Sequence, residues 1–148
     1  MKTLKTLIIL FGPLLCGIIV GLLTNNHQYE LIIKPPYSPP AIIFPIVWSI
    51  LYLLMGISLY IIIKNNNNAT SIRVFITQLV TNLIWPFIFF NFKLYYLAAF
   101  WLLLLIYFVI NMIVNFYSIK KIASYLQISY FLWLLFALYL NLGVALLN

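Results

Sequence analysis

Five long apolar stretches dominate this chain, and they restrict its fold more than any other feature of the sequence. An α-helix rises about 1.5 Å per residue, so about 20 apolar residues cross a hydrocarbon core of about 30 Å. We expect membrane-spanning helices at about 5–24, 41–63, 72–92, 94–117 and 122–147. The sequence therefore predicts an all-α polytopic membrane protein, in which residues 1–148 form a single domain of five transmembrane helices.

The composition supports this class of protein. Hydrophobic residues make up 66% of the chain and charged residues only 6%, whereas soluble domains carry about 25% charged residues. The formal charge of +7 raises the alternative of a nucleic-acid partner. The basic residues stand singly or in pairs at the ends of apolar stretches, which favours anchoring at the lipid interface and no nucleic acid. A single cysteine permits no intrachain disulfide.

The N-terminal stretch has two interpretations. Its basic start and apolar centre are typical of a signal peptide, and Cys16 suggests a lipoprotein cleavage site. The residue before that cysteine, Leu15, is not small, and the apolar part from Leu7 to Leu23 is long for a signal. We therefore expect a retained first helix, in which Gly17 and Gly21 allow another helix to approach closely. Packing within one chain is favoured over a dimer contact.

The segment 25–40 is the longest connection between two apolar stretches. Proline fixes φ, lacks an N–H and moves the preceding residue out of the helical region, so we expect a stiff, extended segment at 34–40. It begins with a lysine and contains four prolines: Lys34, Pro35, Pro36, Pro39 and Pro40. In the helix that follows, Trp48 and Tyr52 are four residues apart and share a face. A stiff loop above an aromatic helix face predicts a lid over a pocket.

The third and fifth helices carry polar residues at membrane depth. Gln78 and Asn82 are expected to face the bundle interior, because amides in hydrocarbon need partners. Pro86 is expected to kink the third helix near Asn82. In the fifth helix Trp133 and Ala137 share a face, and Asn141 lies about 40° further round.

Tryptophans and asparagines are the most distinctive side chains of these helices. An interfacial aromatic belt is one explanation, and we expect it to include Trp101 and many tyrosines. A second group lies on helices that border a proline or a polar kink: Trp48, Asn82, Trp85, Trp133 and Asn141. If these side chains converge, they form a flat-walled, mostly apolar cavity that suits a planar hydrophobic ligand.

Other kinds of chemistry find no support in the sequence. No ionisable residue lies at mid-membrane depth in the expected helices, which argues against an ion-coupled exporter. No residues have the pattern of a metal site, a phosphate-binding loop or an activated nucleophile. The single histidine, His27, is expected to be a loop residue, and no cofactor is predicted.

The charged residues between the helices predict the orientation in the membrane. Six basic residues fall on one side: Lys2, Lys5, Lys64, Arg73, Lys120 and Lys121. Only Lys34 and Lys93 fall on the other side. The positive-inside rule then places the N-terminus in the cytoplasm and the proline segment outside. Short turns between helices favour a bacterial inner membrane.

The chain resembles the tryptophan-rich sensory protein and translocator protein family, TspO, which includes the mitochondrial peripheral-type benzodiazepine receptor. The similar segments follow in the same order: KPPYSPP at 34–40, Trp48 with LYLLMG at 51–56, NLIWPFIFF at 82–90, and YFLWLLFALYLNLGVALLN at 130–148. The resemblance covers nearly the whole chain.

The resemblance implies an up-and-down bundle of five transmembrane helices, commonly dimeric, with the first loop as the lid of a pocket. It implies binding of porphyrins such as protoporphyrin IX, of similar planar ligands and, in many members, of cholesterol. It also implies a regulatory role in tetrapyrrole or stress responses. The resemblance makes Trp48, Asn82, Trp85, Trp133, Ala137 and Asn141 ligand-binding positions, and we add Tyr52 to this set because it shares a helix face with Trp48. Lys34 either pairs with a porphyrin propionate or is an ordinary interfacial lysine.

Two further functions remain open at this level. One is light- and oxygen-dependent porphyrin breakdown, which the resemblance would assign to Trp48 and Trp133; the other is facilitated transport of porphyrin or lipid. Some positions depart from the family pattern, with Tyr37 and Gln28 replacing tryptophans and Trp101 replacing an acidic residue. No basic residue follows Tyr139, so we make no prediction of cholesterol binding.

Overall fold

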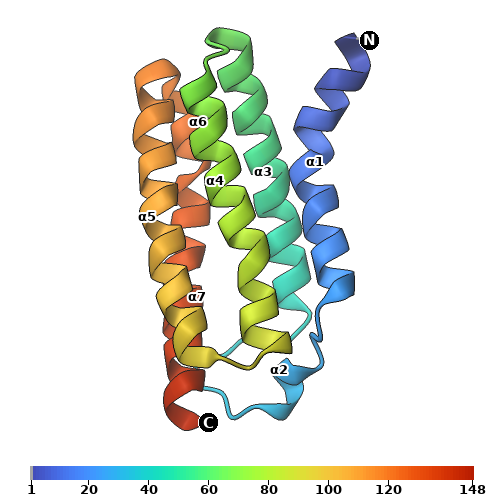
Figure 1. Cartoon of the computed structure of the whole chain (residues 1–148), viewed down its shortest axis with the longest axis vertical. Coiled ribbons are helices and arrows are strands. Elements are labelled where there is room, and N and C mark those ends of the chain that lie inside the picture. Colours follow the sequence, from blue (N-terminus) through green and yellow to red (C-terminus); the bar gives the residue numbers. More distant parts are fainter. Residues whose placement is uncertain (1) are drawn as a thin grey trace.

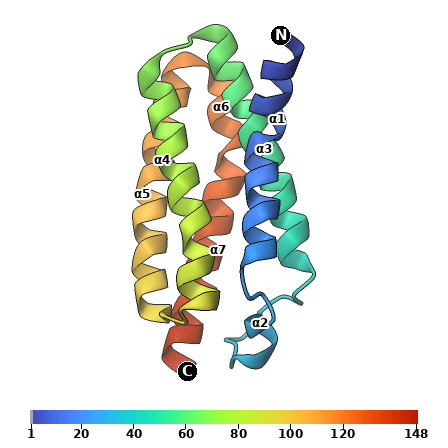
Figure 2. The same ribbon diagram turned by 45° about the vertical axis from the view of Figure 1, so that its right-hand side comes forward.

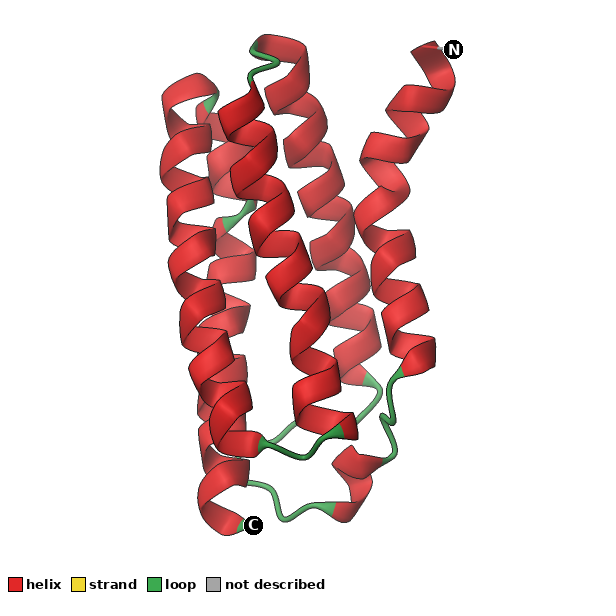
Figure 3. Ribbon diagram, in the orientation of Figure 1, coloured by secondary structure: helices red, strands yellow, loops and turns green. Residues whose placement is uncertain are grey.

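The computed structural model describes residues 2–148, and these form a bundle of long helices without a strand (Figures 1 and 3). Five spans in this part of the chain are long and apolar enough to cross a membrane. The helices are α1 (Lys2–Leu23), α2 (Gln28–Leu31), α3 (Ile43–Asn65), α4 (Ala69–Pro86), η1 (Phe87–Asn91), α5 (Tyr95–Ile119), α6 (Lys121–Leu126) and α7 (Ile128–Leu147). The predicted all-α membrane bundle is confirmed, and its spans alternate up and down (Figure 1).

The order of the helices around the bundle differs from their order along the chain. α1 packs on α3, α3 packs on α6, and α5 packs on both α4 and α7. The C-terminal helix α7 therefore packs along α5, whereas α1 lies at the edge of the bundle and leans away at its N-terminal end (Figures 1 and 2). Most of α1 is exposed, as expected for a helix that faces lipid.

Close approach of α1 to α3 depends on two glycines. A Cβ at Gly17 would collide with the ring of Tyr52, and a Cβ at Gly56 would collide with the backbone of Leu10. The prediction that Gly17 packs within the chain is thus confirmed. Gly21 has open space around its Cα and borders a cavity.

Two helices are less regular than the sequence suggests. After Pro86 the chain forms the π-helix η1, in which the N–H of Phe92 donates to the oxygen of Phe87 at 2.9 Å. A proline removes one helical hydrogen bond, and a π-turn is a known way to accommodate the disturbance. The expected helix 122–147 is interrupted at Gln127, whose buried side chain donates from Nε2 to the oxygen of Leu54 at 3.2 Å.

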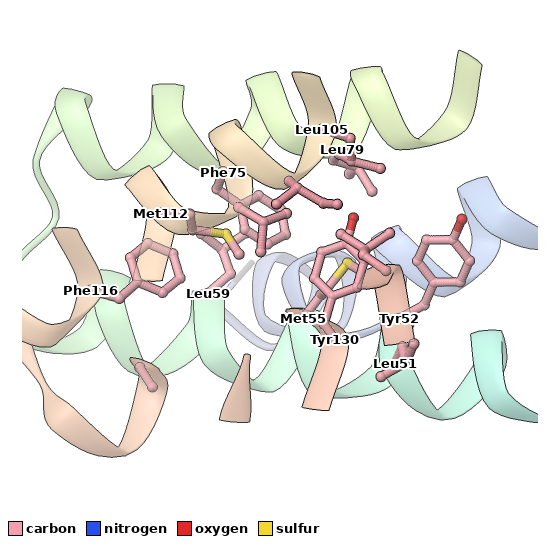
Figure 4. Packing of buried hydrophobic residues seen from close by; sticks show 14 of the residues in the cluster. Leu51, Tyr52, Met55, Leu59, Phe75, Leu79, Leu105, Met112, Phe116 and Tyr130 are labelled. Carbon is pink, nitrogen blue, oxygen red and sulfur yellow. The ribbon is translucent and has the colours of Figure 1, made fainter. Parts of the chain in front are cut away.

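The main core fills the half of the bundle that contains the α3–α4 and α5–α6 turns. Its fully buried side chains include Ile62 and Ala123. Phe75, Met112 and Phe116 are buried in the same core (Figure 4). The rings of Phe75 and Phe116 stack with centroids 6.5 Å apart. The other half, next to the loop between α1 and α3, holds a smaller buried cluster that includes Ile88, Phe89 and Val144, and a cavity beside this cluster is the candidate site.

Candidate ligand-binding site

A cavity of about 450 Å³ lies between α1, α3, α4 with η1, and α7. The loop between α1 and α3 covers it with Asn26, Tyr29, Ser38 and Ala41. Its volume falls within the range of about 300–1,000 Å³ that is usual for small-molecule sites. None of the residues that line it is charged, and most of its surface is apolar. The expected pocket beneath the proline loop is therefore present in the structure.

Aromatic pairs on two helices form much of the cavity wall. On α3, the rings of Trp48 and Tyr52 lie 5.6 Å apart at an interplanar angle of 31°. On α4 and η1, the rings of Trp85 and Phe89 stack at 5.1 Å and 28°. All four side chains line the cavity. Such a lining provides the flat apolar surfaces that a planar ligand needs.

The two asparagines of the cavity wall connect helices to one another. Asn141 accepts the indole N–H of Trp85 at 3.0 Å and donates to the backbone oxygen of Tyr95 at 2.8 Å. Asn82 accepts the hydroxyl of Tyr52 at 2.6 Å and donates to the hydroxyl of Tyr130 at 2.8 Å. Both amides are thus engaged by the protein. They join the walls of the cavity, and fewer of their polar groups are free than the sequence predicted.

Trp133 is the one predicted ligand-binding residue that the structure leaves outside the cavity. It lines a separate shallow groove between α3 and α7, while Ala137, one turn later, lines the cavity. Its ring contacts Phe44, a cavity residue, in an edge-to-face arrangement at 5.9 Å. Trp48 and Trp133 therefore do not meet in one slot, contrary to the expectation. The indole N–H of Trp133 is buried without a hydrogen-bond partner among residues 2–148.

Hydrogen bonds within the covering loop make it stiff. The hydroxyl of Tyr29 donates to the oxygen of Pro39 at 2.6 Å, and that of Ser38 donates to the oxygen of Pro35 at 2.7 Å. Lys34 donates from Nζ to the oxygen of Tyr29 at 2.8 Å and lies 4.8 Å from the centre of its ring. Burial raises the pKa of the Tyr29 hydroxyl, and the nearby hydroxyl of Ser38 acts in the opposite direction. None of the four prolines lines the cavity; they shape the loop instead.

The loop is attached to the end of α7. The ring of Pro35 lies so close to Gly143 that a Cβ there would be 2.5 Å from it. The hydroxyl of Tyr139 donates to the oxygen of Pro36 at 2.7 Å. The Asn148 side chain accepts from the N–H of Ile33 at 3.0 Å and donates to its oxygen at 2.8 Å. These contacts hold the lid against the C-terminal helix.

Several site residues and one polar contact were not predicted. Phe44 precedes Trp48 by one helical turn, so the spacing used for Tyr52 would also have identified it. Tyr29 and the π-helical Phe90 gave no signal of their own. Trp101, expected in an interfacial belt, donates its N–H to the oxygen of Thr81 at 2.8 Å, a contact that was not predicted. Residues 2–148 contain no group of three metal-ligating side chains, and His27 does not line the cavity.

Comparison with known proteins places these features in a family. The profile of the TspO/MBR family matches residues 9–147. The chain is 33% identical over 127 residues to the tryptophan-rich protein TspO of Chlorobaculum tepidum, which covers 83% of this chain and 80% of that protein. It is 37% identical over 122 residues to the protein of the same name from Archaeoglobus fulgidus, covering 81% and 79%.

A eukaryotic relative extends the match over still more of the chain. The translocator protein homolog of Schizosaccharomyces pombe is 32% identical over 146 residues, covering 92% of this chain and 87% of that protein. The family profile and these identities together leave almost no part of the bundle unmatched. The chain is therefore an integral, multi-pass membrane protein that belongs to the TspO/MBR family.

Proposed function

We propose that this protein binds a flat hydrophobic ligand of the porphyrin class in the cavity beneath the loop, and that it acts as a membrane sensor in tetrapyrrole or stress responses. The observation that carries the proposal is the uncharged, covered cavity with the Trp48–Tyr52 and Trp85–Phe89 pairs in its walls. A planar macrocycle gains contact area against such rings, and no charged side chain of the cavity wall has to be desolvated when it binds.

Each part of the wall has its own role in this proposal. Trp48 and Trp85 contact the faces or edges of the macrocycle. Ala137 is small and leaves room for it, and Asn82 and Asn141 keep the helices at the right separation. Lys34 lies at the lid beside Tyr29, where its ammonium group is available to a propionate at the edge of the ligand.

Binding is favoured over the two other functions that the sequence left open. Porphyrin breakdown by a pair of tryptophans is not supported by the placement of Trp133, which lies behind Phe44 and outside the cavity. Passage across the bundle would require a path through the opposite half, where Met112 and Phe116 are fully buried in packed core. A closed end suits a receptor better than a channel.

A titration of the purified protein with protoporphyrin IX tests the proposal. Saturable quenching of tryptophan fluorescence is expected, with an affinity that falls at least tenfold in Trp48→Phe. Trp133→Phe is the matched control, because it changes the same side chain outside the cavity, and it should bind as the wild type does. Absence of saturable binding to the wild-type protein would refute the proposed function.

The placement in the membrane is part of the same proposal. The N-terminus and the α3–α4 and α5–α6 turns lie at the end opposite the lid, and this end carries six of the eight basic residues (Figure 1). We place that end in the cytoplasm of a bacterial cell, with the lid outside. Labelling of a single introduced cysteine in the loop from outside intact cells tests the orientation.

A homodimer, which the family resemblance implies, is testable by the mass of the protein in detergent.

A further inference from the structure

A row of five hydrogen-bonded side chains runs from the cavity wall into the core. The hydroxyl of Tyr52 donates to Oδ1 of Asn82 at 2.6 Å, and Nδ2 of Asn82 donates to the hydroxyl oxygen of Tyr130 at 2.8 Å. Tyr130 in turn donates to Oε1 of Gln78 at 3.0 Å, and Nε2 of Gln78 lies 3.9 Å from the sulfur of Met55. The row thus joins α3, α4 and α7.

Only the outer end of this row touches the cavity. Tyr52 and Asn82 line it, whereas Tyr130, Gln78 and Met55 do not. These last three side chains are at most 1% exposed, and Figure 4 shows Met55 and Tyr130 among the packed side chains of the core. At such burial no water competes for their hydrogen bonds. The polar groups of these three side chains therefore have only one another and Asn82 as partners.

Hydrogen bonds in such a row can run in either of two directions. A hydroxyl rotates and a carboxamide flips, so the reverse row would have Gln78 donating to Tyr130, Tyr130 to Asn82, and Asn82 to Tyr52. In the reverse row the Tyr52 hydroxyl would be free to donate to a ligand. Which direction holds depends on the groups at the ends.

The inner end selects the direction that the structure shows. The thioether of Met55 has no hydrogen and can only accept, so it favours the amino group of Gln78 over its oxygen. The oxygen of Gln78 must then face Tyr130 and accept its proton. Each following bond is fixed in turn, and the single proton of the Tyr52 hydroxyl is held by Asn82.

We propose that Met55 and Gln78 are positioning residues that make Tyr52 a hydrogen-bond acceptor toward the ligand, so that the cavity prefers flat ligands with an N–H or O–H donor over ligands of the same shape that carry only an acceptor. This inference rests on the proposed function, because it takes the cavity to be the ligand site. An acceptor on the ligand would face the lone pairs of Tyr52 without a hydrogen between them. Buried polar groups that are left unpaired are what makes such selection strong.

Carbazole and dibenzofuran are suitable test ligands. Both have three fused flat rings of nearly the same shape, but carbazole carries an N–H where dibenzofuran carries a ring oxygen. Isothermal titration of the full-length protein in detergent should give carbazole about a fivefold higher affinity, the size expected for one net hydrogen bond. Tyr52→Phe removes the acceptor and should bring the ratio of the two affinities close to one.

Variants at the inner end separate positioning from general stability. Gln78→Leu removes the acceptor of Tyr130, so Tyr130 turns its proton to Asn82 and the preference for carbazole should vanish or invert. Gln78→Glu keeps an acceptor oxygen at this place and should preserve the preference. Met55→Leu, which removes the sulfur, should lower the ratio. Ile62→Val changes a buried residue elsewhere on α3 and should leave the ratio unchanged.

A measurement without ligand covers the case in which Gln78→Leu or Met55→Leu fails to fold. The ultraviolet resonance Raman spectrum of the wild type minus that of Tyr52→Phe reports whether the Tyr52 hydroxyl donates or accepts. The signature of a Tyr52 hydroxyl that donates a hydrogen bond to Asn82 is expected. The signature of a hydroxyl that donates nothing to the protein would overturn the inference.

The results distinguish the inference from the proposed function. If both test ligands bind the wild type with equal affinity, or if folded Gln78→Leu and Met55→Leu keep the wild-type ratio, the inference is wrong while ligand binding stands. If neither test ligand nor protoporphyrin IX binds, the proposed function is wrong and the inference is wrong with it.

Discussion

Pro35 in the loop and Gly143 near the end of α7 pack so closely that no side chain fits between them. The pyrrolidine ring takes the place that a side chain at position 143 would occupy. This contact, together with the Tyr139–Pro36 hydrogen bond at 2.7 Å, couples the lid of the cavity to the C-terminal helix. Displacement of the lid therefore requires that the loop separate from α7.

Substitution of Gly143 by alanine is expected to loosen the lid. The new Cβ would lie 2.5 Å from the Pro35 ring, and overpacking of this kind costs about 1–3 kcal/mol unless the loop moves. Because the loop is at the surface, we expect it to shift, so that limited proteolysis within 25–40 becomes faster and a bound ligand dissociates faster. Gly12→Ala is the control, since nothing lies within 4 Å of a Cβ there. Equal proteolysis of the two variants would contradict the coupling.

Substitution of Ala137 by leucine is expected to block the cavity. Ala137 lines it, and the added atoms would occupy space that the ligand needs. We expect at least a tenfold loss of affinity for protoporphyrin IX, with the bundle still folded because the cavity accommodates the larger side chain. Ala69→Leu, at the exposed start of α4, should bind normally. Unchanged binding by Ala137→Leu would place the ligand elsewhere.

Substitution of Asn82 by leucine is expected to destabilise the bundle. The hydroxyls of Tyr52 and Tyr130 would each lose a partner inside the protein, and a buried group without a partner costs about 1–3 kcal/mol. The midpoint of thermal unfolding in detergent should fall accordingly. Asn111→Leu should change it little, because Asn111 is exposed and bonds only to the backbone oxygen of Tyr107 on its own helix. Similar unfolding midpoints for both variants would show that the hydrogen bonds of Asn82 with Tyr52 and Tyr130 do not stabilise the bundle.

The stability of the lid is expected to depend on pH only in strongly alkaline solution. Burial raises the pKa of the Tyr29 hydroxyl above its ordinary value of 10.0, so the closed lid holds this proton more tightly than the open lid. The stabilisation is complete below about pH 10 and is lost as pH rises through the raised pKa. The rate of loop proteolysis, divided by the activity of the protease at the same pH, should thus be constant from about pH 6 to 9. It should rise above about pH 10.

Removal of the Tyr29 hydroxyl provides the control for this effect. Tyr29→Phe keeps the ring over which Lys34 lies but cannot donate to the oxygen of Pro39. Its lid should be looser at neutral pH and should show no further alkaline step. An alkaline step of the wild-type size in Tyr29→Phe would assign the titration to another group.

Several local features were predictable because they follow from covalent geometry and spacing. Prolines at 35, 36, 39 and 40 cannot continue a helix, so a stiff connection was certain to separate the first two spans. Gln78 and Asn82 had to face inward, because hydrocarbon offers their amides no partners, and both are buried. The short helix α2 inside the loop was not predicted, since four residues give no periodic signal.

Other features depend on neighbours that the chain brings together only on folding. At the break near Gln127, the side chain donates to the oxygen of Leu54, 73 residues away. The engagement of Asn141 depends on Trp85 and Tyr95, which come from two other elements. Nothing in the sequence near position 127 or 141 indicates these partners.

The sequence by itself determined that the protein lies in a membrane, how many spans it has and where its stiff loop stands. The reason is that the length and hydropathy of a stretch, and the conformation of its prolines, depend on neighbouring residues in the sequence. Only the tertiary structure decided which tryptophans share the cavity. Residues four apart on a helix differ in direction by about 40°, and the span made of α6 and α7 packs on α3 through α6 as well as on α5. For that reason Ala137 faces the cavity, while Trp133 turns to the groove beside α3.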